Sequence, residues 1–402
     1  MSAAHATFGV QVASSLRNRT AIVGIGESDI GKVPHLSGLG LTAQAAKRAL
    51  DDSGLALSDI DGLLTAYSLT EPFFMMGTVL CEYLGLKPRF CSSLVAGGAT
   101  PAILLGHAAA AINAGQASCV LVCTGENRAT GMSRDSAVSS LASAVGHPYV
   151  EYPYGNSIPG CYAMITRRYM HEYGITREQL AQVPVTTRRH AGLHPNSHMK
   201  APITIADVIA SKPIASPLNL LDCCLISDAA GAIIVMSADR ARHLAKNPVY
   251  LLGTGECHTH EHIVCAESLV RFGVMESGQE AYRMAGLGPE DIDIAQLYDC
   301  FSIVPILELE ELGFCKAGEG GSFYAAGHAA LGERLPVNTH GGMLSHAHAG
   351  ATGGMLGIIE AVAQLRGECG ERQVSDAHTA LVHNEGGILS SNCTVILADE
   401  PR

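Results

Sequence analysis

Tryptophan is absent from this 402-residue chain, and charged residues are scarce at 16%. No apolar run is long enough to cross a bilayer, and residues 1–20 lack the apolar core of a secretory signal. A net charge of -12 argues against nucleic acid as a ligand. We therefore expect a cytoplasmic protein without membrane or nucleic-acid partners, and the low surface charge favours an oligomer.

The 13 cysteines follow neither a disulfide framework nor zinc-finger spacing, since they are scattered through apolar segments without a CxxC pair. We expect mostly buried, reduced thiols. His258, His260 and His262 alternate in the segment HTHEH, and on a strand they would share one face, as metal ligands do. A polar rim or an interface explains the same pattern. We favour that interpretation, so no metal site is expected.

An internal repeat is the main positive feature of the sequence. AIVGIGES at 21–28 is matched by YLLGTGEC at 250–257, and each is followed by a helical pattern, an Asp-Ile-Asp turn and an apolar strand. A Gly-rich turn, a helix and another apolar strand come next in both halves. Such continuous apolar strands are typical of sheets buried on both faces. The repeat predicts an α/β protein with halves at 1–245 and 246–402, and helices between and outside two sheets.

The first half carries a long insertion at about 127–217. It is rich in Pro, Gly, His and Tyr and poor in long apolar runs. Insertions of this size over a rigid scaffold usually shape a pocket, so we expect a long loop segment beside the ligand site.

The repeat, together with GGMLSHAHAGATGG at 341–354 and HNEGG at 383–387, resembles the thiolase superfamily. It is most similar to the thiolase-like lipid-transfer proteins related to sterol carrier protein x thiolase. The resemblance covers nearly the whole chain. It implies a duplicated thiolase fold with α-β-α-β-α layers, and a homodimer formed through the segment around 119–124.

The resemblance also places the family's nucleophilic cysteine on this chain. Counting back from AINAG at 111–115, that position falls on Gly98, so the expected nucleophile is missing. Cys91 lies seven residues earlier. We expect it on the preceding strand, and it remains a candidate for a displaced nucleophile.

The other family positions are only partly kept. His348 stands where the family's Gly-His loop has its histidine. Tyr298 and Asp299 replace the Asn and Glu of an Asn-Glu-x-Phe segment, and His383 takes the place of the second cysteine. A tyrosine packed in the core and a buried aspartate with a purely structural role remain alternatives for Tyr298 and Asp299.

Glycine cannot form an acyl-enzyme, but a turn can still stabilise an enolate oxygen through its N–H groups. We assign this role to Gly98 and Gly387, with His348 as a side-chain donor, and place Gly386 and His346 at the same thioester-binding site. Retro-aldol cleavage of a β-hydroxyacyl-CoA would use such a site. It needs a base and an acid, for which Tyr298, His348 and His383 are candidates, with Asp299 orienting them.

This combination of lost cysteine and gained tyrosine resembles the steroid side-chain-cleaving aldolases of the superfamily. The resemblance implies a small partner protein with an OB-fold and a zinc ribbon. Coenzyme A is then part of the substrate, and no tightly bound cofactor is expected. Two alternatives remain, an acyltransferase that uses a displaced cysteine and a non-catalytic carrier or scaffold for acyl-CoA or lipid.

Overall fold

A computed structural model describes residues 16–244 and 246–402 of the chain. Nine strands form one sheet in the order β3-β2-β4-β7-β1-β8-β11-β10-β9, and β5 and β6 form a small separate sheet. The strands are β1 (Thr20–Glu27), β2 (Gly62–Ala66), β3 (Phe90–Leu94), β4 (Cys119–Asn127), β5 (Pro213–Ala215), β6 (Leu218–Asn219), β7 (Asp228–Ser237), β8 (Val249–His258), β9 (Ile294–Gln296), β10 (Thr379–Gly386) and β11 (Ser391–Ala398).

The order of elements repeats, as the sequence predicts. In the first half β1, α1, β2, α3, β4 and β7 follow one another, and β8, α9, β9, α12, β10 and β11 do so in the second. The helices are α1 (Gly38–Ser53), α2 (Met76–Leu84), α3 (Thr100–Asn113), α4 (Arg134–Val145), α5 (Ile158–Tyr173), α6 (Arg177–Leu193), α7 (Ile205–Ala210), α8 (Ala238–Ala241), α9 (Val274–Ala285), α10 (Val304–Glu311), α11 (Gly320–Ala325) and α12 (Thr352–Leu365).

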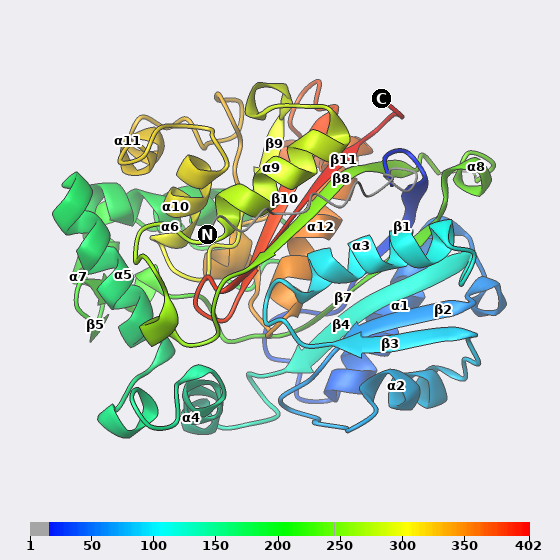
Figure 1. Ribbon diagram of the computed structural model, residues 1–402, viewed down its shortest axis with the longest axis horizontal. Helices are drawn as coiled ribbons and strands as arrows, with labels where there is room; N and C mark the ends of the chain where they lie inside the picture. The colour runs from blue at the N-terminus through cyan, green and yellow to red at the C-terminus, as the bar shows by residue number, and fades with distance from the viewer. Residues whose placement is uncertain (1–15, 245) are drawn as a thin grey trace, which may run out of the picture.

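Helices α3 and α12 form a central layer, because both contact strands of the first half and strands of the second (Figure 1). Helix α1 packs on β1, β4 and β7 from outside, and α9 packs on β8 and β11. The sheets of the two halves join where β1 pairs with β8 through two residue pairs, Ala21–Tyr250 and Ile22–Val249. The predicted layered thiolase fold is confirmed, with the strands of both halves in one continuous hydrogen-bonded order.

The Gly-x-Gly sequence shared by β1 and β8 allows each outer helix to lie close to the sheet backbone. A Cβ atom on Gly26 would lie 2.3 Å from the carbonyl oxygen of Ala45 in α1. A Cβ atom on Gly255 would lie 2.2 Å from the carbonyl oxygen of Ser277 in α9. Any side chain at these positions would force the helix away from the strand. The repeated motif therefore allows the same close packing of helix on strand in both halves.

The insertion at 127–217 lies between β4 and β7, but helices α4 to α7 occupy most of it instead of a long loop. Capping side chains start these helices. The Ser157 hydroxyl accepts from the N–H of Gly160 at the start of α5. Thr176 and Gln179 form a reciprocal capping box at the start of α6. Such local signals do not require long apolar runs, which explains why composition alone indicated a loop.

The segment expected at a homodimer interface, residues 119–124, is inside the sheet. It belongs to β4, which is hydrogen-bonded to β2 on one side and β7 on the other, and its side chains are buried. It therefore cannot meet a second chain, and this location of the interface is wrong. The edge of the sheet in this half is β3.

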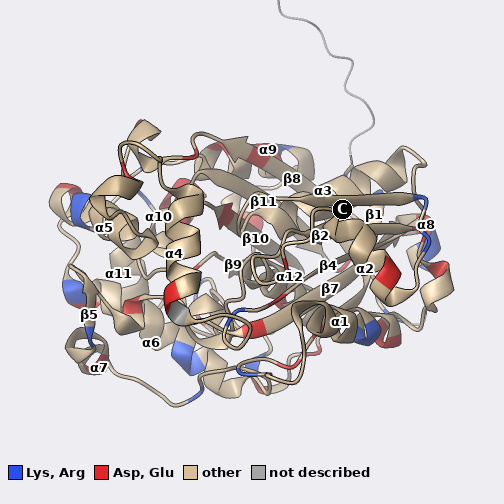
Figure 2. Cartoon of the chain, turned by 90° about the horizontal axis from the view of Figure 1, so that it is seen from below, with Lys and Arg blue, Asp and Glu red and all other residues tan. Residues whose placement is uncertain are grey.

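Lys and Arg side chains lie mainly on the outer helices and in loops (Figure 2), whereas the central sheet and α12 carry carboxylates, among them Glu27, Glu385 and Glu360. Within the described residues, no helix combines the length and the apolar character needed to cross a membrane.

Candidate active site

Two glycine-containing turns, one from each half, meet above the central helices. The first turn precedes α3, and the second follows β10. A Cβ atom on Gly97 would lie 2.8 Å from the Cα atom of Gly386 and 2.9 Å from the nitrogen of Gly387. A Cβ atom on Gly386 would lie 2.0 Å from the carbonyl oxygen of Ala96. Backbone therefore packs directly on backbone here, and the structure brings together the three glycines assigned to the thioester site, Gly98, Gly386 and Gly387.

Tyr298 fills the space where a side chain of residue 98 would lie. A Cβ atom on Gly98 would be 1.9 Å from the Tyr298 hydroxyl oxygen and 2.1 Å from the ring carbon that bears it. Tyr298 follows the carboxyl end of β9, so it enters the site from the opposite half of the molecule. A cysteine at position 98 and a tyrosine in this position exclude each other sterically.

Burial keeps the Tyr298 hydroxyl in its neutral form. The side chain is 5% exposed, and desolvation raises the pKa of its phenol well above the usual value, with a further contribution from Glu385. The backbone N–H of Tyr298 donates to Glu308 Oε2 at 2.8 Å. A buried, protonated phenol is suited to donating a proton.

His348 lies close to Tyr298 and precedes α12. The two rings are 6.4 Å apart between centroids and nearly perpendicular. His348 Nδ1 lies 3.3 Å from the Cys224 sulfur, and the His348 backbone carbonyl accepts from the N–H of Ser227. Burial lowers the pKa of the His348 imidazole to about 3, with Arg128 adding to the effect. The ring is therefore neutral at physiological pH.

Asp299 holds the segment that leads to His348. Residues Gly342–His346 form a π-helix turn, and the Asp299 carboxylate accepts from the N–H of Met343 at 2.7 Å. A Cβ atom on Gly342 would lie 2.1 Å from Asp299 Oδ2, so only glycine admits the carboxylate this close. Burial raises the pKa of Asp299 to about 7, although the N–H donors oppose the shift. Asp299 is therefore placed to position the histidine loop.

His383 lies on β10, fully buried, and contacts Tyr298 only through a shared neighbour. Its Nδ1 is 2.8 Å from the Thr394 hydroxyl, and its Nε2 is 3.8 Å from Glu308 Oε1. Glu308 in turn accepts the N–H of Tyr298. Burial lowers the pKa of His383 to about 3 and raises that of Glu308 well above its usual range.

His346, which was assigned to the thioester-binding site, does not lie beside Tyr298 and His348. Its side chain points to the other side of the loop, where Nε2 lies 3.2 Å from Glu27 Oε1 and Nδ1 lies 3.0 Å from the Ser197 hydroxyl. The rings of His194 and His340 pack against it at 4.4 and 5.1 Å.

Three neighbours of the site were missed by sequence reasoning. Cys224 contacts His348 through its sulfur. Glu385 Oε1 accepts from the Tyr162 hydroxyl at 2.6 Å and from the Cys300 thiol at 3.1 Å, and burial raises its pKa to about 7. Asn384 lies beside the carbonyl of Gly98, since a Cβ atom on Gly354 would approach both. Asn384 and Glu385 stand inside the HNEGG segment, so that motif carried a usable signal, whereas nothing marked Cys224 among the cysteines.

Cys91 lies on β3, the strand before the Gly98 turn, as predicted. Its sulfur is 3.8 Å from that of Cys81, and burial raises the pKa of the Cys91 thiol above its usual value. A Cβ atom on Gly77, in the first turn of α2, would lie 2.8 Å from this sulfur, but the raised pKa keeps the thiol protonated, so Cys91 lacks the character of a nucleophilic thiolate.

The three histidines of HTHEH do not converge. β8 ends at His258, so His260 and His262 lie beyond the strand. His258 Nε2 is 3.2 Å from Glu256, His260 Nδ1 is 2.8 Å from Thr259, and His262 Nδ1 is 3.0 Å from the carbonyl of Val145. Each ring has its own partner, in agreement with the interpretation as a polar rim.

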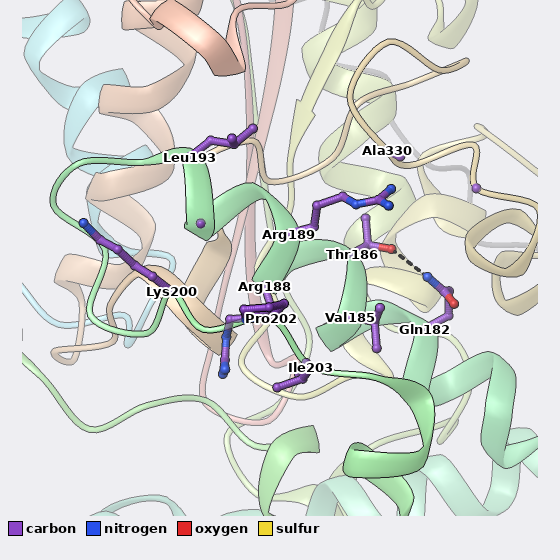
Figure 3. Close-up of a pocket in the computed structure, with 12 residues that line it drawn as sticks. Gln182, Val185, Thr186, Arg188, Arg189, Leu193, Lys200, Pro202, Ile203 and Ala330 are labelled. Atoms are coloured by element: carbon purple, nitrogen blue, oxygen red, sulfur yellow. Dashed lines mark hydrogen bonds between the residues drawn. The ribbon is translucent and has the colours of Figure 1, made fainter.

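A cavity of about 570 Å³ opens beside α6, with the side chains of Arg189 and Lys200 among those around it (Figure 3). Gln182 donates to the Thr186 hydroxyl along its wall. No predicted site residue lines this cavity. It is nevertheless linked to the histidine loop, because Arg188 of the same helix donates to the Ser345 hydroxyl at 2.8 Å.

Known proteins resemble this chain over nearly its whole length. Residues 255–399 match a family model described as Thiolase C-terminal domain-like. The 17-hydroxy-3-oxo-4-pregnene-20-carboxyl-CoA lyase of Mycobacterium tuberculosis is 38% identical over 370 residues, which are 88% of this chain and 92% of that protein. An acetyl-CoA acetyltransferase of Methanothermobacter thermautotrophicus is 32% identical over 376 residues, 91% of this chain and 96% of that protein.

A solved structure of an Ltp2-ChsH2(DUF35) aldolase superposes with a TM-score of 0.85 at 35% sequence identity. The match covers 96% of this chain and 99% of that chain. Fold, repeat and identity agree, so the chain belongs to the thiolase superfamily, in the branch of the thiolase-like lipid-transfer proteins.

Proposed function

We propose that this protein cleaves a carbon–carbon bond in an acyl-CoA thioester, by retro-aldol cleavage of a β-hydroxyacyl-CoA without an acyl-enzyme. The observation that carries the proposal is the 1.9 Å approach of the Tyr298 hydroxyl to the Cβ position of residue 98. A phenol therefore occupies the place of the thiolase nucleophile, and proton transfer replaces covalent catalysis at that point.

The protonation states of the two facing side chains suit this reaction. Neutral His348 accepts the proton of the β-hydroxyl as the Cα–Cβ bond breaks, which releases a ketone or aldehyde and a thioester enolate. N–H groups of the Gly98 and Gly387 turns stabilise the enolate oxygen. The protonated Tyr298 donates to the enolate carbon and forms acetyl- or propionyl-CoA. Return of the proton from His348 to Tyr298 through solvent resets the site.

The names of the relatives support this reaction type. The relative from Mycobacterium tuberculosis is a carboxyl-CoA lyase, and the superposed structure is that of an aldolase. Coenzyme A enters as part of the substrate, and we propose no tightly bound cofactor. His383 is assigned a supporting part, because it meets Tyr298 only through Glu308.

Acyl transfer is the second candidate, and the Cys224–His348 contact at 3.3 Å favours it. A cysteine beside a histidine is the usual arrangement of an activated thiol. Burial, however, raises the pKa of the Cys224 thiol far above its ordinary value, so the thiol form dominates. An acyl adduct on Cys224 in mass spectra after incubation with acyl-CoA would place this candidate first.

We also propose two protein partners. The first is a small DUF35-type protein, because the superposed structure is described as an Ltp2-ChsH2(DUF35) aldolase, which names a DUF35 protein together with Ltp2. The second is another copy of this chain, bound along the edge strand β3. Cys91, Ser92 and Ser93 of this strand are exposed, Val95 directly after it is 71% exposed, and Phe74 before the adjacent helix α2 is fully exposed. An edge strand beside exposed apolar groups favours pairing with a second chain.

The deciding experiment incubates the purified chain, alone and with a DUF35-type partner, with a panel of β-hydroxyacyl-CoA thioesters. We expect acetyl- or propionyl-CoA together with a ketone or an aldehyde, identified by mass spectrometry. Stoichiometric acyl-CoA binding without any product across the panel would exclude the lyase and leave a non-catalytic carrier or scaffold.

A further inference from the structure

Glu27, His194 and His346 form a compact group behind the histidine loop. They come from the end of β1, the residue after α6 and the last residue of the π-helix turn, so the fold alone brings them together. One potential ligand atom of each lies within 4.8 Å of those of the other two. His346 is fully buried, His194 is 5% exposed, and the Glu27 side chain is 14% exposed.

The hydrogen bonds around His346 leave its Nε2 lone pair facing a carboxylate. The Ser197 hydroxyl has one proton, which it donates to the backbone carbonyl of His340 at 3.2 Å. Ser197 therefore accepts from His346, and Nδ1 of that ring carries a proton. Nε2 then faces Glu27 Oε1 at 3.2 Å, and two acceptor atoms directed at each other favour a cation between them.

The second oxygen of Glu27 and one nitrogen of His194 are also held in place. Asn196 donates its side-chain N–H to Glu27 Oε2 at 3.1 Å, which leaves Oε1 as the free ligand atom. The backbone N–H of Asn196 donates to His194 Nδ1 at 3.1 Å, so Nε2 is the nitrogen left for an ion. An ion there displaces the proton that Nε2 otherwise carries.

We propose that Glu27, His194 and His346 bind one divalent transition-metal ion, with zinc as the best fit. Two imidazoles and one carboxylate are an established zinc ligand set. Ligand bonds of about 2.0–2.2 Å in a tetrahedron separate the ligand atoms by about 3.3 Å, and Glu27 Oε1 and His346 Nε2 are 3.2 Å apart. The Ser197 contact supplies the outer hydrogen bond that orients a metal-bound imidazole.

An ion can reach this site from solvent. Glu27, His194 and Asn196 line a cavity of about 570 Å³ between residues of α1 and α12, together with charged side chains of both signs, Arg48, Asp51, Asp52, Glu360 and Arg372. Water in this cavity completes the coordination. The ion then ties β1 and the end of α6 to the loop that carries His348 two residues further on, and so positions that loop.

The test measures metal binding and is independent of the proposed reaction. The full chain is stripped with a chelator, titrated with Zn²⁺ and Co²⁺, and analysed by calorimetry, by metal content after gel filtration, and by the visible absorption of bound cobalt. We expect one ion per chain, bound with a Kd of micromolar or tighter, and a cobalt spectrum typical of low coordination number.

Variants separate this site from the other histidines and the cysteines. His346→Gln and Glu27→Gln should weaken binding at least 100-fold with an unchanged circular dichroism spectrum. Ser197→Ala should weaken it about 10-fold, since it keeps the three ligands and removes the hydrogen bond that orients His346. His258→Gln is the matched control, because it disrupts the His258–Glu256 pair at the corresponding end of β8 and should leave binding unchanged. Absence of saturable binding, or binding unaffected by His346→Gln, would show an imidazolium–carboxylate pair instead and overturn the proposal.

Discussion

The turns that precede the two central helices differ in whether they carry a reactive side chain. Before α3, the turn ending at Gly98 has no reactive side chain, and Tyr298 from the other half occupies the vacant space. Before α12, the turn carries His348, whose ring lies 6.4 Å from that of Tyr298. Of these two turns, the first thus contributes backbone groups to the site, and the second contributes a side chain.

This difference shows that the packing of the fold does not determine which reactive residue each turn carries. Both turns occupy equivalent places in the repeat, and both helices are buried between strands of the two halves. Packing therefore demands the same backbone in each half but not the same reactive residue. Loss of a nucleophile in one turn can be compensated by a residue from the other half, because the two turns face one site.

Removal of the reactive side chain from the second turn should have the largest effect. His348→Ala is expected to lower kcat about 1000-fold, because the site loses the neutral imidazole that accepts the hydroxyl proton. Steady-state kinetics on the cleaved thioester, with thermal unfolding as the folding control, measures this. Residual activity above one tenth of the parent's would mean that the second turn does not hold the base.

Addition of a side chain to the first turn should have the next largest effect. Gly98→Ala places a methyl group on the Tyr298 hydroxyl and displaces it by about 1 Å or more, for which we expect a loss of about 100-fold in kcat/KM. Gly40→Ala in α1 is the control, since its added Cβ meets only ordinary contacts. Equal activity in the two variants would show that the space beside Gly98 has no catalytic use.

Tyr298 lies between the two turns, and its hydroxyl can be removed without displacing its ring. Tyr298→Phe keeps the ring and removes the hydroxyl, so we expect kcat to fall 10- to 100-fold with little change in KM. A change in KM alone would assign Tyr298 to substrate binding.

Asp299 supports the turn that carries His348, and its ionisation should affect how the free energy of unfolding depends on pH. The Asp299 pKa is about 7 in the fold and about 3.9 when unfolded, so the native state binds the extra proton between these values. This residue therefore makes stability fall as pH rises from 4 to 7. Asp299→Asn should remove about 3 kcal/mol of the fall between pH 5 and pH 8, measured by urea unfolding at these two pH values. An unchanged slope would contradict the raised pKa.

The smallest effect is expected on the strand before the first turn. Cys91→Ala should leave kcat/KM within about twofold, because the thiol lies beside Cys81 and its raised pKa keeps it protonated. Iodoacetamide labelling of Cys91, followed by an activity assay, gives an independent measurement. A dead variant would restore Cys91 as a displaced nucleophile.

Features that repeat along the chain could be predicted from sequence. The duplicated strands and helices and the position of Cys91 on a strand depend on neighbouring residues and local pattern, whereas the assignment of the nucleophile position to Gly98 depended on the family resemblance. The contact between Gly98 and Tyr298 could be inferred only through the resemblance, because 200 positions separate the two residues.

Contacts between distant segments with no repeat could not be predicted. Cys224, in the segment before β7, meets His348. Glu27 meets His194 and His346 because the insertion packs against the histidine loop. The insertion itself was misjudged because capping residues, not apolar runs, start its helices. The dimer segment was misplaced because strand order in the sheet differs from order in the chain.

The position of the Tyr298 ring beside Gly98 also has an evolutionary consequence. A substitution of Gly98 by cysteine would not recreate a thiolase, because the tyrosine already fills the volume that the thiol would need. Replacement of Tyr298 alone would leave neither nucleophile nor phenol. A return to acyl-enzyme chemistry requires two substitutions, one in each half. Each is harmful without the other, so single substitutions are not expected to restore the thiolase reaction.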